Sequence, residues 1–196
     1  MQNKLSIIIP IFNEKKILKF FFNELFDVFK NYYVEYIIIN DGSFDGTEKW
    51  LNDYIKPISG KKVEKFFFKK SNSFSLACKE ISYGDKFSEV IILNHSKNQG
   101  KGSSIISGLK KSSGDYILIL DSDMEYDIRD SLNLYNIIKK NKTGEVIFGN
   151  RFSNQLPHRH GYILNLVVNH INTFIFNILF NSGISDINCG LKIFSR

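Results

Sequence analysis

Residues 5 to 43 read LSIIIPIFNEKKILKFFFNELFDVFKNYYVEYIIINDGS, and this stretch decides the fold. It opens with a run of branched apolar residues, Leu5 to Ile11, which is typical of a strand buried on both faces. From Glu14 to Phe29 apolar residues recur three and four positions apart, and this spacing predicts a helix with one wide apolar face. A second buried run follows from Val34 to Ile39. The stretch therefore starts an alternating pattern of strands and helices.

The same alternation continues along the chain. Further strands are predicted at 90–94, 116–120 and 145–149, and further helices at 47–54, 102–111 and 131–140. Short loops join these segments, which favours a single α/β domain built on a doubly wound, mostly parallel sheet with helices on both faces. Ligands bind such sheets outside the carboxyl ends of the strands, so functional residues are expected directly after each strand.

Two segments depart from this pattern. The lysine-rich stretch from 56 to 88 predicts a strand at 63–68, some helix near 76–81 and an insertion into the domain. Between Tyr162 and Asn181, asparagines and His170 interrupt a long apolar run whose apolar residues keep helical spacing. This pattern predicts an amphipathic helix, which either packs on the sheet or lies at a membrane interface.

Composition narrows the function classes. The 196 residues are 43% hydrophobic and 23% charged, which excludes a disordered chain, a collagen-like repeat and a polytopic membrane protein. A net charge of +6 favours anionic partners such as phosphates or an acidic membrane face. Nucleic acid is not expected as a partner, because no recognition module is evident. Two distant cysteines and an N-terminus unlike a signal peptide favour a cytoplasmic location.

The strongest local signal for chemistry is Asp121-Ser122-Asp123, directly after the apolar run YILIL. Two carboxylates one residue apart at a strand end can both reach one hard divalent cation, although a simple turn also explains such a pair. Asp41 follows another strand and could accept a hydrogen bond from a base or a ribose. The loop from Asn98 to Gly102 precedes a helix but matches neither a Walker A motif nor the dinucleotide fingerprint. Arg151, after the strand at 145–149, is a candidate for binding a phosphate, or is surface charge.

Five motifs occur in an order that resembles the inverting glycosyltransferases of family 2, and most of all the dolichyl- or polyprenyl-phosphate mannosyl- and glucosyltransferases. They are IIIPIFNE, IIINDGSFDGT, NQGKGSSIISGLKKSSGDYILILDSDMEYD, FGNRF and ISDINCGLKIFSR. The resemblance runs from Leu5 to Arg196 except for the 56–88 stretch. Members of the family usually continue further, so it implies a catalytic domain at 1–196 with a short C-terminal part. It also implies the GT-A fold and a Mg²⁺ or Mn²⁺ ion.

The resemblance further implies roles for individual residues. The residues expected around the nucleotide and diphosphate are Pro10, Asn13, Glu14, Asp41, Lys101, Asp115 and Asp121. The metal ligands expected are Asp121, Asp123 and Glu125. The residues expected to act in catalysis are Asp123, Arg151 at a phosphate, and Asp186 on the acceptor side.

The expected reaction moves a hexose from a UDP- or GDP-sugar to a polyprenyl phosphate at the cytosolic face of a membrane, with the protein bound peripherally. A lipid phosphate is already an anion, so a strong general base is less necessary than for a hydroxyl acceptor, where Asp186 would be the candidate base. Two alternatives remain open. The chain could act on a glycan or glycolipid hydroxyl, or it could be a non-catalytic relative that binds sugar nucleotides.

Overall fold

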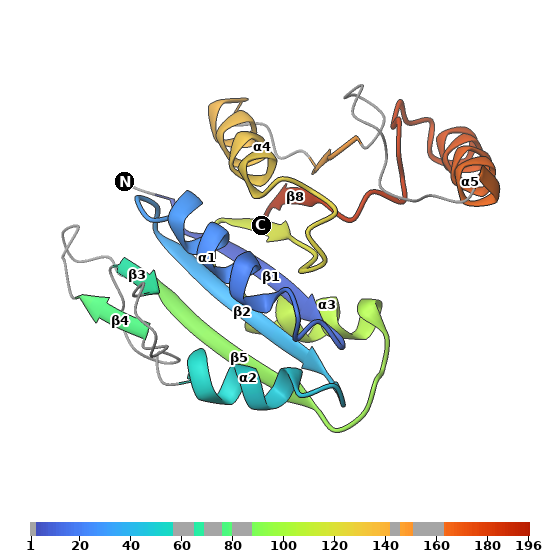
Figure 1. The fold of residues 1–196 in the computed structure, drawn as a ribbon. Helices are drawn as coiled ribbons and strands as arrows, with labels where there is room; N and C mark the ends of the chain where they lie inside the picture. The colour runs from blue at the N-terminus through green and yellow to red at the C-terminus, as the bar shows by residue number, and fades with distance from the viewer. Residues whose placement is uncertain (1–2, 57–64, 69–75, 80–87, 142–145, 151–162) are drawn as a thin grey trace.

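The computed structural model describes residues 3–56, 65–68, 76–79, 88–141, 146–150 and 163–196 (Figure 1). The helices are α1 Leu18–Val28, α2 Thr47–Tyr54, α3 Lys101–Lys111, α4 Ile128–Asn141 and α5 Ile163–Phe180. The strands of the main sheet are β1 Leu5–Ile11, β2 Val34–Asp41, β5 Glu89–His95, β6 Tyr116–Ile119, β7 Val146–Phe148 and β8 Lys192–Ser195. The alternating strands and helices predicted from the sequence are confirmed, with ends shifted by a few residues.

The main sheet has the strand order β5-β2-β1-β6-β8-β7. β1 pairs in parallel with β2 and β6, and β2 pairs in parallel with β5. β8 runs antiparallel between β6 and β7. The expectation of a mostly parallel sheet is therefore confirmed, while β8 was not predicted, because a four-residue run containing a lysine gives only a weak strand signal.

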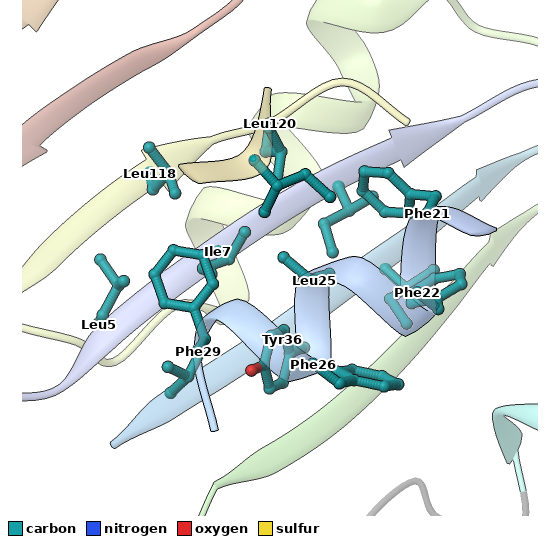
Figure 2. Close-up of a cluster of buried hydrophobic side chains, with 14 of the residues drawn as sticks. Leu5, Ile7, Phe21, Phe22, Leu25, Phe26, Phe29, Tyr36, Leu118 and Leu120 are labelled. Carbon is teal, nitrogen blue, oxygen red and sulfur yellow. The ribbon is translucent and has the colours of Figure 1, made fainter. Parts of the chain in front are cut away.

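Helices cover both faces of the sheet. On one face, α1 buries Phe21, Phe22 and Phe26 against side chains of β1 and β2 (Figure 2). On the other face, Leu109 of α3 packs against a cluster that contains Ile8 of β1. α3 lies so close to the sheet that a Cβ on its Gly108 would come within 2.6 Å of Ile8 Cγ2. Apolar clusters therefore hold the strands from both faces, and this positions the loops that follow the carboxyl ends of the strands.

The helix predicted near 76–81 is wrong. Residues Leu76–Lys79 form a strand, β4, which pairs antiparallel with β3, Lys65–Phe68, as a separate two-stranded sheet. A helix of about six residues is too short to be stable without tertiary support, whereas the hairpin gains cross-strand hydrogen bonds. The predicted strand at 63–68 is confirmed over its described part. Most of the expected insertion at 56–88 lies outside the described residues.

α5 was predicted either to pack on the sheet or to lie at a membrane interface, and it does not bury its apolar side chains on the sheet. Phe174, Ile178 and Leu179 are 65%, 65% and 71% exposed. From residue 167 to the end of this helix, the buried side chains are instead polar, Asn169 and Thr173. In Figure 1 α5 stands away from the strands. Within the described part of the chain, no helix is both long enough and apolar enough to cross a membrane.

Candidate nucleotide and metal site

An open cavity of about 260 Å³ lies at the carboxyl ends of β1, β2 and β6. Its lining residues are Pro10, Ile11, Phe12, Glu14, Asp41, Asn98, Gly100, Lys101, Ser104, Asp121, Ser122 and Asp123. The strands end here side by side because they are parallel, which brings residues more than 100 positions apart into one cavity. This edge is where sheets of this type bind ligands.

Asp121 follows β6 in sequence, and in space it lies against the segment that precedes β8. Its Oδ2 accepts a hydrogen bond from Lys101 Nζ at 2.5 Å, across from the start of α3. A Cβ on Gly190 would overlap the same oxygen, so the backbone at Gly190 packs directly against the Asp121 carboxylate. Gly190 N–H in turn donates to Tyr126 Oη at 2.9 Å. The position of Asp121 is therefore set by three separate segments of the chain.

Asp123 and Glu14 bring further negative charge into the cavity. Asp123 Oδ1 accepts the Glu125 N–H at 2.9 Å, which fixes the carboxylate in the turn after β6. The pKa of Glu14 is raised above its usual value, mainly by burial and then by the charges of Asp123 and Asp45. A divalent cation would relieve this repulsion, and carboxylate oxygens are the ligands that Mg²⁺ and Mn²⁺ prefer.

The chemistry of the donor set therefore fits a hard cation held in part by phosphate oxygens of a ligand. Among the described residues, no three His, Cys, Asp or Glu side chains are already gathered as a complete protein site. Mg²⁺ is commonly held by one or two carboxylates together with substrate phosphates, so two carboxylates such as Asp121 and Asp123 would be enough to hold it. Glu125 is exposed and is not among the residues that line the cavity.

Asp41 is tied to the loop that precedes α3. Its carboxylate accepts hydrogen bonds from His95 Nδ1 at 2.6 Å and from the N–H groups of Gln99 at 3.0 Å and Gly100 at 2.8 Å. Burial opposes ionisation of Asp41, but these hydrogen bonds and the nearby His95 outweigh it and hold the pKa of Asp41 below its usual value. His95 Nε2 lies 3.0 Å from Ser107 Oγ on α3. Asp41 thus positions the loop that carries Gly100 and Lys101.

The loop after β1 is joined to the loop after β2. Asn13 has a left-handed backbone with φ of 58°, and its Oδ1 accepts the Phe44 N–H at 2.9 Å while its own N–H donates to Ser43 Oγ at 3.0 Å. Pro10 and Glu14 line the cavity, whereas Asn13 supports the loop from outside it. Phe12 and Phe44 meet edge to face at the mouth, with ring centres 5.9 Å apart.

Besides Asn13 and Glu125, three further expected site residues lie apart from the cavity or outside the described residues. Asp115 lies at the opposite end of β6, where it accepts the Lys4 N–H at 2.8 Å, so the structure does not bring it to the nucleotide side. Asp186 is 1% exposed and accepts a hydrogen bond from Asn169 Nδ2 of α5 at 2.9 Å. Arg151 lies outside the described residues.

Sequence reasoning missed three residues at this edge. His95 ends the strand beside Asp41, and the rule that functional residues follow strands could have found it. Gly190 and Lys192 lie in the motif ISDINCGLKIFSR, but they were assigned no role, because the strand that begins at Lys192 was not predicted.

Curated relatives resemble between about three fifths and nearly all of the chain, and the match covers only part of each relative. It is 28% identical to a dolichyl-phosphate beta-glucosyltransferase of Dictyostelium discoideum over 205 residues, which cover 98% of this chain and 54% of that protein. It is 27% identical to a prophage bactoprenol glucosyl transferase homolog of Escherichia coli strain K12 over 124 residues, 62% of this chain and 31% of that protein. The chain spans about half the length of the dolichyl-phosphate relatives that it matches.

Solved structures show the same fold. The mannosyltransferase PcManGT from Pyrobaculum calidifontis, in complex with GDP-Man and Mn²⁺, matches with a TM-score of 0.57 and 13% identity over 100% of this chain and 45% of that chain. Glucosyl-3-phosphoglycerate synthase from Mycobacterium tuberculosis matches with a TM-score of 0.58 and 14% identity over 98% and 57%. Both are GT-A glycosyltransferases, and the expected GT-A fold is confirmed.

The sequence model of "Glycosyl transferase family 2" matches residues 6–196, almost the entire chain. The chain therefore belongs to glycosyl transferase family 2.

Proposed function

We propose that this chain is the catalytic part of an inverting glycosyltransferase that moves a hexose from a UDP- or GDP-sugar to a polyprenyl phosphate. The observation that carries the proposal is the cavity at the carboxyl edge of the sheet, where Lys101 stands beside Asp121 and Asp123. The relatives named for dolichyl-phosphate and bactoprenol glucosyl transfer support a lipid-phosphate acceptor.

In this proposal the donor lies along the edge from β2 to β6. Pro10 and Phe12 border the nucleoside, and Asp41 acts mainly by holding the loop whose Gly100 and Lys101 face the diphosphate. Asp121 and Asp123 hold Mg²⁺ or Mn²⁺, with Glu14 nearby. Such an ion, when bound, stabilises the negative charge of the leaving diphosphate. Glu125 contributes through its backbone, which orients Asp123.

The acceptor needs little activation. A phosphate monoester is an anion at neutral pH, so its oxygen can attack the anomeric carbon from the face opposite the leaving diphosphate without a strong general base. We propose that Arg151 contacts the acceptor or donor phosphate. Because Asp186 is buried and bonded to Asn169, we assign it a positioning role between α5 and β8 and not the role of a base.

The outer face of α5 is the surface that suits a lipid carrier. Val168, Ile171, Phe174 and Leu179 are each between 47% and 71% exposed. An apolar helix face of this kind binds the boundary between lipid headgroups and acyl chains, and the net charge of +6 adds attraction to acidic lipids. We therefore also propose that the protein binds peripherally to the cytosolic face of a membrane.

The first experiment is calorimetric titration of UDP and of GDP into the full chain, each with Mn²⁺ and with a chelator. We expect one nucleotide to bind, with an affinity that depends on the metal. Asp123→Ala should abolish the metal-dependent part, whereas Asp130→Ala, an exposed aspartate at the start of α4, should leave it unchanged. Metal-dependent binding that survives in Asp123→Ala contradicts the assignment of the site.

The second experiment tests the acceptor. Full chain is incubated with the donor that binds, and with a short polyprenyl phosphate or a glycolipid that carries free hydroxyls. The proposal is supported if the hexose is transferred to the phosphate and NMR shows that its anomeric configuration is inverted relative to the donor. Product on the hydroxyl favours the alternative acceptor, and donor binding without any product favours a non-catalytic relative.

A further inference from the structure

Lys192 is a half-buried lysine at the edge of the site that has no assigned role. It begins β8, where it pairs with Ile119 of β6 on one side and with Phe148 of β7 on the other. Ile119 is the last residue of β6, two positions before Asp121. Lys192 therefore lies at the same carboxyl edge of the sheet as the carboxylates of the cavity.

The direction of the Lys192 side chain follows from the alternation of burial around it. Cys189, Leu191 and Ile193 are buried at 0%, 2% and 0% exposure, and the partly exposed Gly190 and Lys192 alternate with them. A Cβ on Gly190 would overlap Asp121 Oδ2 and would lie 3.3 Å from Lys101 Nζ. Lys192 begins the extended strand, so its side chain lies on the face opposite the buried Ile193, where the charges of Lys101 and Asp121 act on it.

The charge of Lys192 is not neutralised within the described residues. Its Nζ lies 5.2 Å from the centre of the Phe148 ring, and no described carboxylate lies within 4.0 Å of it. Lys101, in contrast, is paired with Asp121. A half-buried ammonium without an ion-pair partner is unfavourable, so Lys192 is available to an anionic ligand.

We propose that Lys192 and Lys101 together form an anion site beside Asp121 that binds a phosphate group. This inference rests on the proposed function for its ligand, which is a phosphate of the nucleotide donor or of the lipid-phosphate acceptor. In this site the Lys192 ammonium binds the phosphate, and the Lys101 ammonium contacts both the phosphate and Asp121.

The electrostatic surroundings agree with this arrangement. Burial lowers the pKa of Lys192, and the nearby charge of Lys101 lowers it further, whereas Cys189, Asp121 and Asp186 act in the opposite direction. A phosphate between the two lysines would remove the repulsion between them, because it is attracted to both. The Lys192 ammonium lies over the Phe148 ring, and this neutral ring holds the ammonium in place without cancelling its charge.

The test compares Lys192→Ala, Lys192→Arg and Lys139→Ala in the full chain. Lys139 is a matched control, because its Nζ also lies over an aromatic ring, that of Tyr135 at 5.8 Å, but on α4. Each variant is titrated calorimetrically with inorganic pyrophosphate, UDP and GDP in the presence of Mg²⁺, and with citronellyl phosphate. Uridine and guanosine serve as ligands without phosphate.

We expect Lys192→Ala to weaken phosphate binding about tenfold or more, as for the loss of a charge-assisted hydrogen bond. Lys192→Arg should restore most of the affinity, and Lys139→Ala should match the wild type. A loss with pyrophosphate and the nucleotides assigns the site to the donor, and a loss with citronellyl phosphate alone assigns it to the acceptor. Equal affinities of Lys192→Ala and wild type for all phosphate probes overturn the inference.

The outcomes separate this inference from the proposed function. Binding of UDP or GDP by the wild type, together with equal affinities of Lys192→Ala and wild type for every phosphate probe, overturns only the anion site. Lys192-dependent binding of pyrophosphate without binding of either nucleotide supports the anion site and contradicts the proposed donor. Thermal unfolding of each variant controls for misfolding, and Lys192→Met, which keeps the apolar stem on Phe148, replaces Lys192→Ala if the alanine variant unfolds.

Discussion

α1 and α5 are both amphipathic helices, but α1 turns its apolar face toward the protein and α5 turns its apolar face toward solvent. In α1 the apolar side chains point inward, and Leu18, Phe21, Phe22 and Leu25 are each 0% exposed. In α5 the apolar side chains point outward, and the inward face carries Asn169, Thr173 and Asn177 at four-residue spacing. These polar side chains hydrogen-bond with Ile184, Asp186 and Ile187 and with Ser182. Helical periodicity identifies two faces, but it does not say which of them is turned toward the protein.

The difference has an energetic basis. The inner face of α5 is stable because most of its polar groups are hydrogen-bonded to the segment that follows the helix. The outer face is an apolar patch that water does not favour, and such patches mark surfaces for lipid or protein partners. α1 contributes to folding, whereas the outward side chains of α5 are available for binding. Four variants test this difference between buried positions that stabilise the fold and exposed positions that are available for binding. They are described in the order of their expected effect on stability.

The largest effect is expected in α1. Phe26→Ala removes a ring that is 1% exposed and packs against Phe22 and Tyr36, with ring centres 5.5 Å and 5.1 Å away. The lost burial and the cavity should lower the free energy of unfolding by about 3–5 kcal/mol, measured by urea denaturation. Phe20→Ala, on the same helix but 64% exposed, is the control and should change it by less than about 0.5 kcal/mol. Equal losses in both variants would contradict the buried role of this face.

Glu35 gives the opposite face of the sheet, the one covered by α3, a dependence on pH. This carboxylate is 2% exposed and is bonded to Lys4 Nζ at 2.7 Å and Ser6 Oγ at 2.6 Å. Burial opposes its ionisation, but hydrogen bonds from Lys4, Ser6 and Ser113 outweigh burial and keep the pKa of Glu35 below its ordinary value of 4.5. Its contribution to stability is therefore complete above about pH 4.5 and declines as the pH falls through the lower folded-state value.

Glu35→Gln should accordingly lower the free energy of unfolding by about 1–3 kcal/mol at pH 7. The difference from wild type should shrink as the pH is lowered below 4.5. Urea denaturation at several pH values measures both effects, with the exposed Glu48→Gln as control. A difference that grows toward low pH would show that the sign of the pKa shift is wrong.

The polar face of α5 should have a smaller and more local effect. The Asn177 side chain donates to Ile184 O at 2.9 Å and accepts from Ser182 Oγ at 2.7 Å and from Ile184 N at 3.1 Å. Asn177→Ala should cost about 1–2 kcal/mol locally and increase hydrogen exchange of the amides at 182–187 about tenfold. Asn172→Ala, on the exposed side of the same helix, should leave exchange unchanged. Unchanged exchange in Asn177→Ala would show that these bonds do not hold the segment.

The smallest effect on stability is expected on the outer face of α5. The double variant Phe174→Ser, Leu179→Ser should change the free energy of unfolding by less than about 0.5 kcal/mol, because both side chains are largely exposed. Its sedimentation with vesicles of acidic phospholipid should nevertheless fall about tenfold, since apolar burial in the membrane is lost. Phe20→Ser removes an exposed phenylalanine from α1 and should sediment like wild type. Equal sedimentation of all three proteins would exclude α5 as the membrane contact.

The parts that sequence could predict were those governed by local periodicity. Tyr116 to Leu120 is a continuous apolar run, and Val34 to Ile39 is one that only Glu35 interrupts, so the central strands and the position of Asp121 and Asp123 followed directly. The contacts of Asp41 could not be foreseen, because His95 and Gly100 reach it only through the pairing of β2 with β5. β8 and the packing of Gly190 on Asp121 escaped for the same reason. They depend on contacts between segments about 70 residues apart, which no local pattern records.

The position of β8 has a consequence for how the protein is made. β8 follows all the other described strands in sequence, yet it lies inside the sheet between β6 and β7. During synthesis, β1, β2, β5 and β6 can pair before residues 192–195 leave the ribosome, but the edge beside Asp121 cannot close until then. Because this pairing is long-range and carries a high entropic cost of loop closure, we expect it to be a late step of folding. The scaffold would then form first, and the binding edge would be completed last.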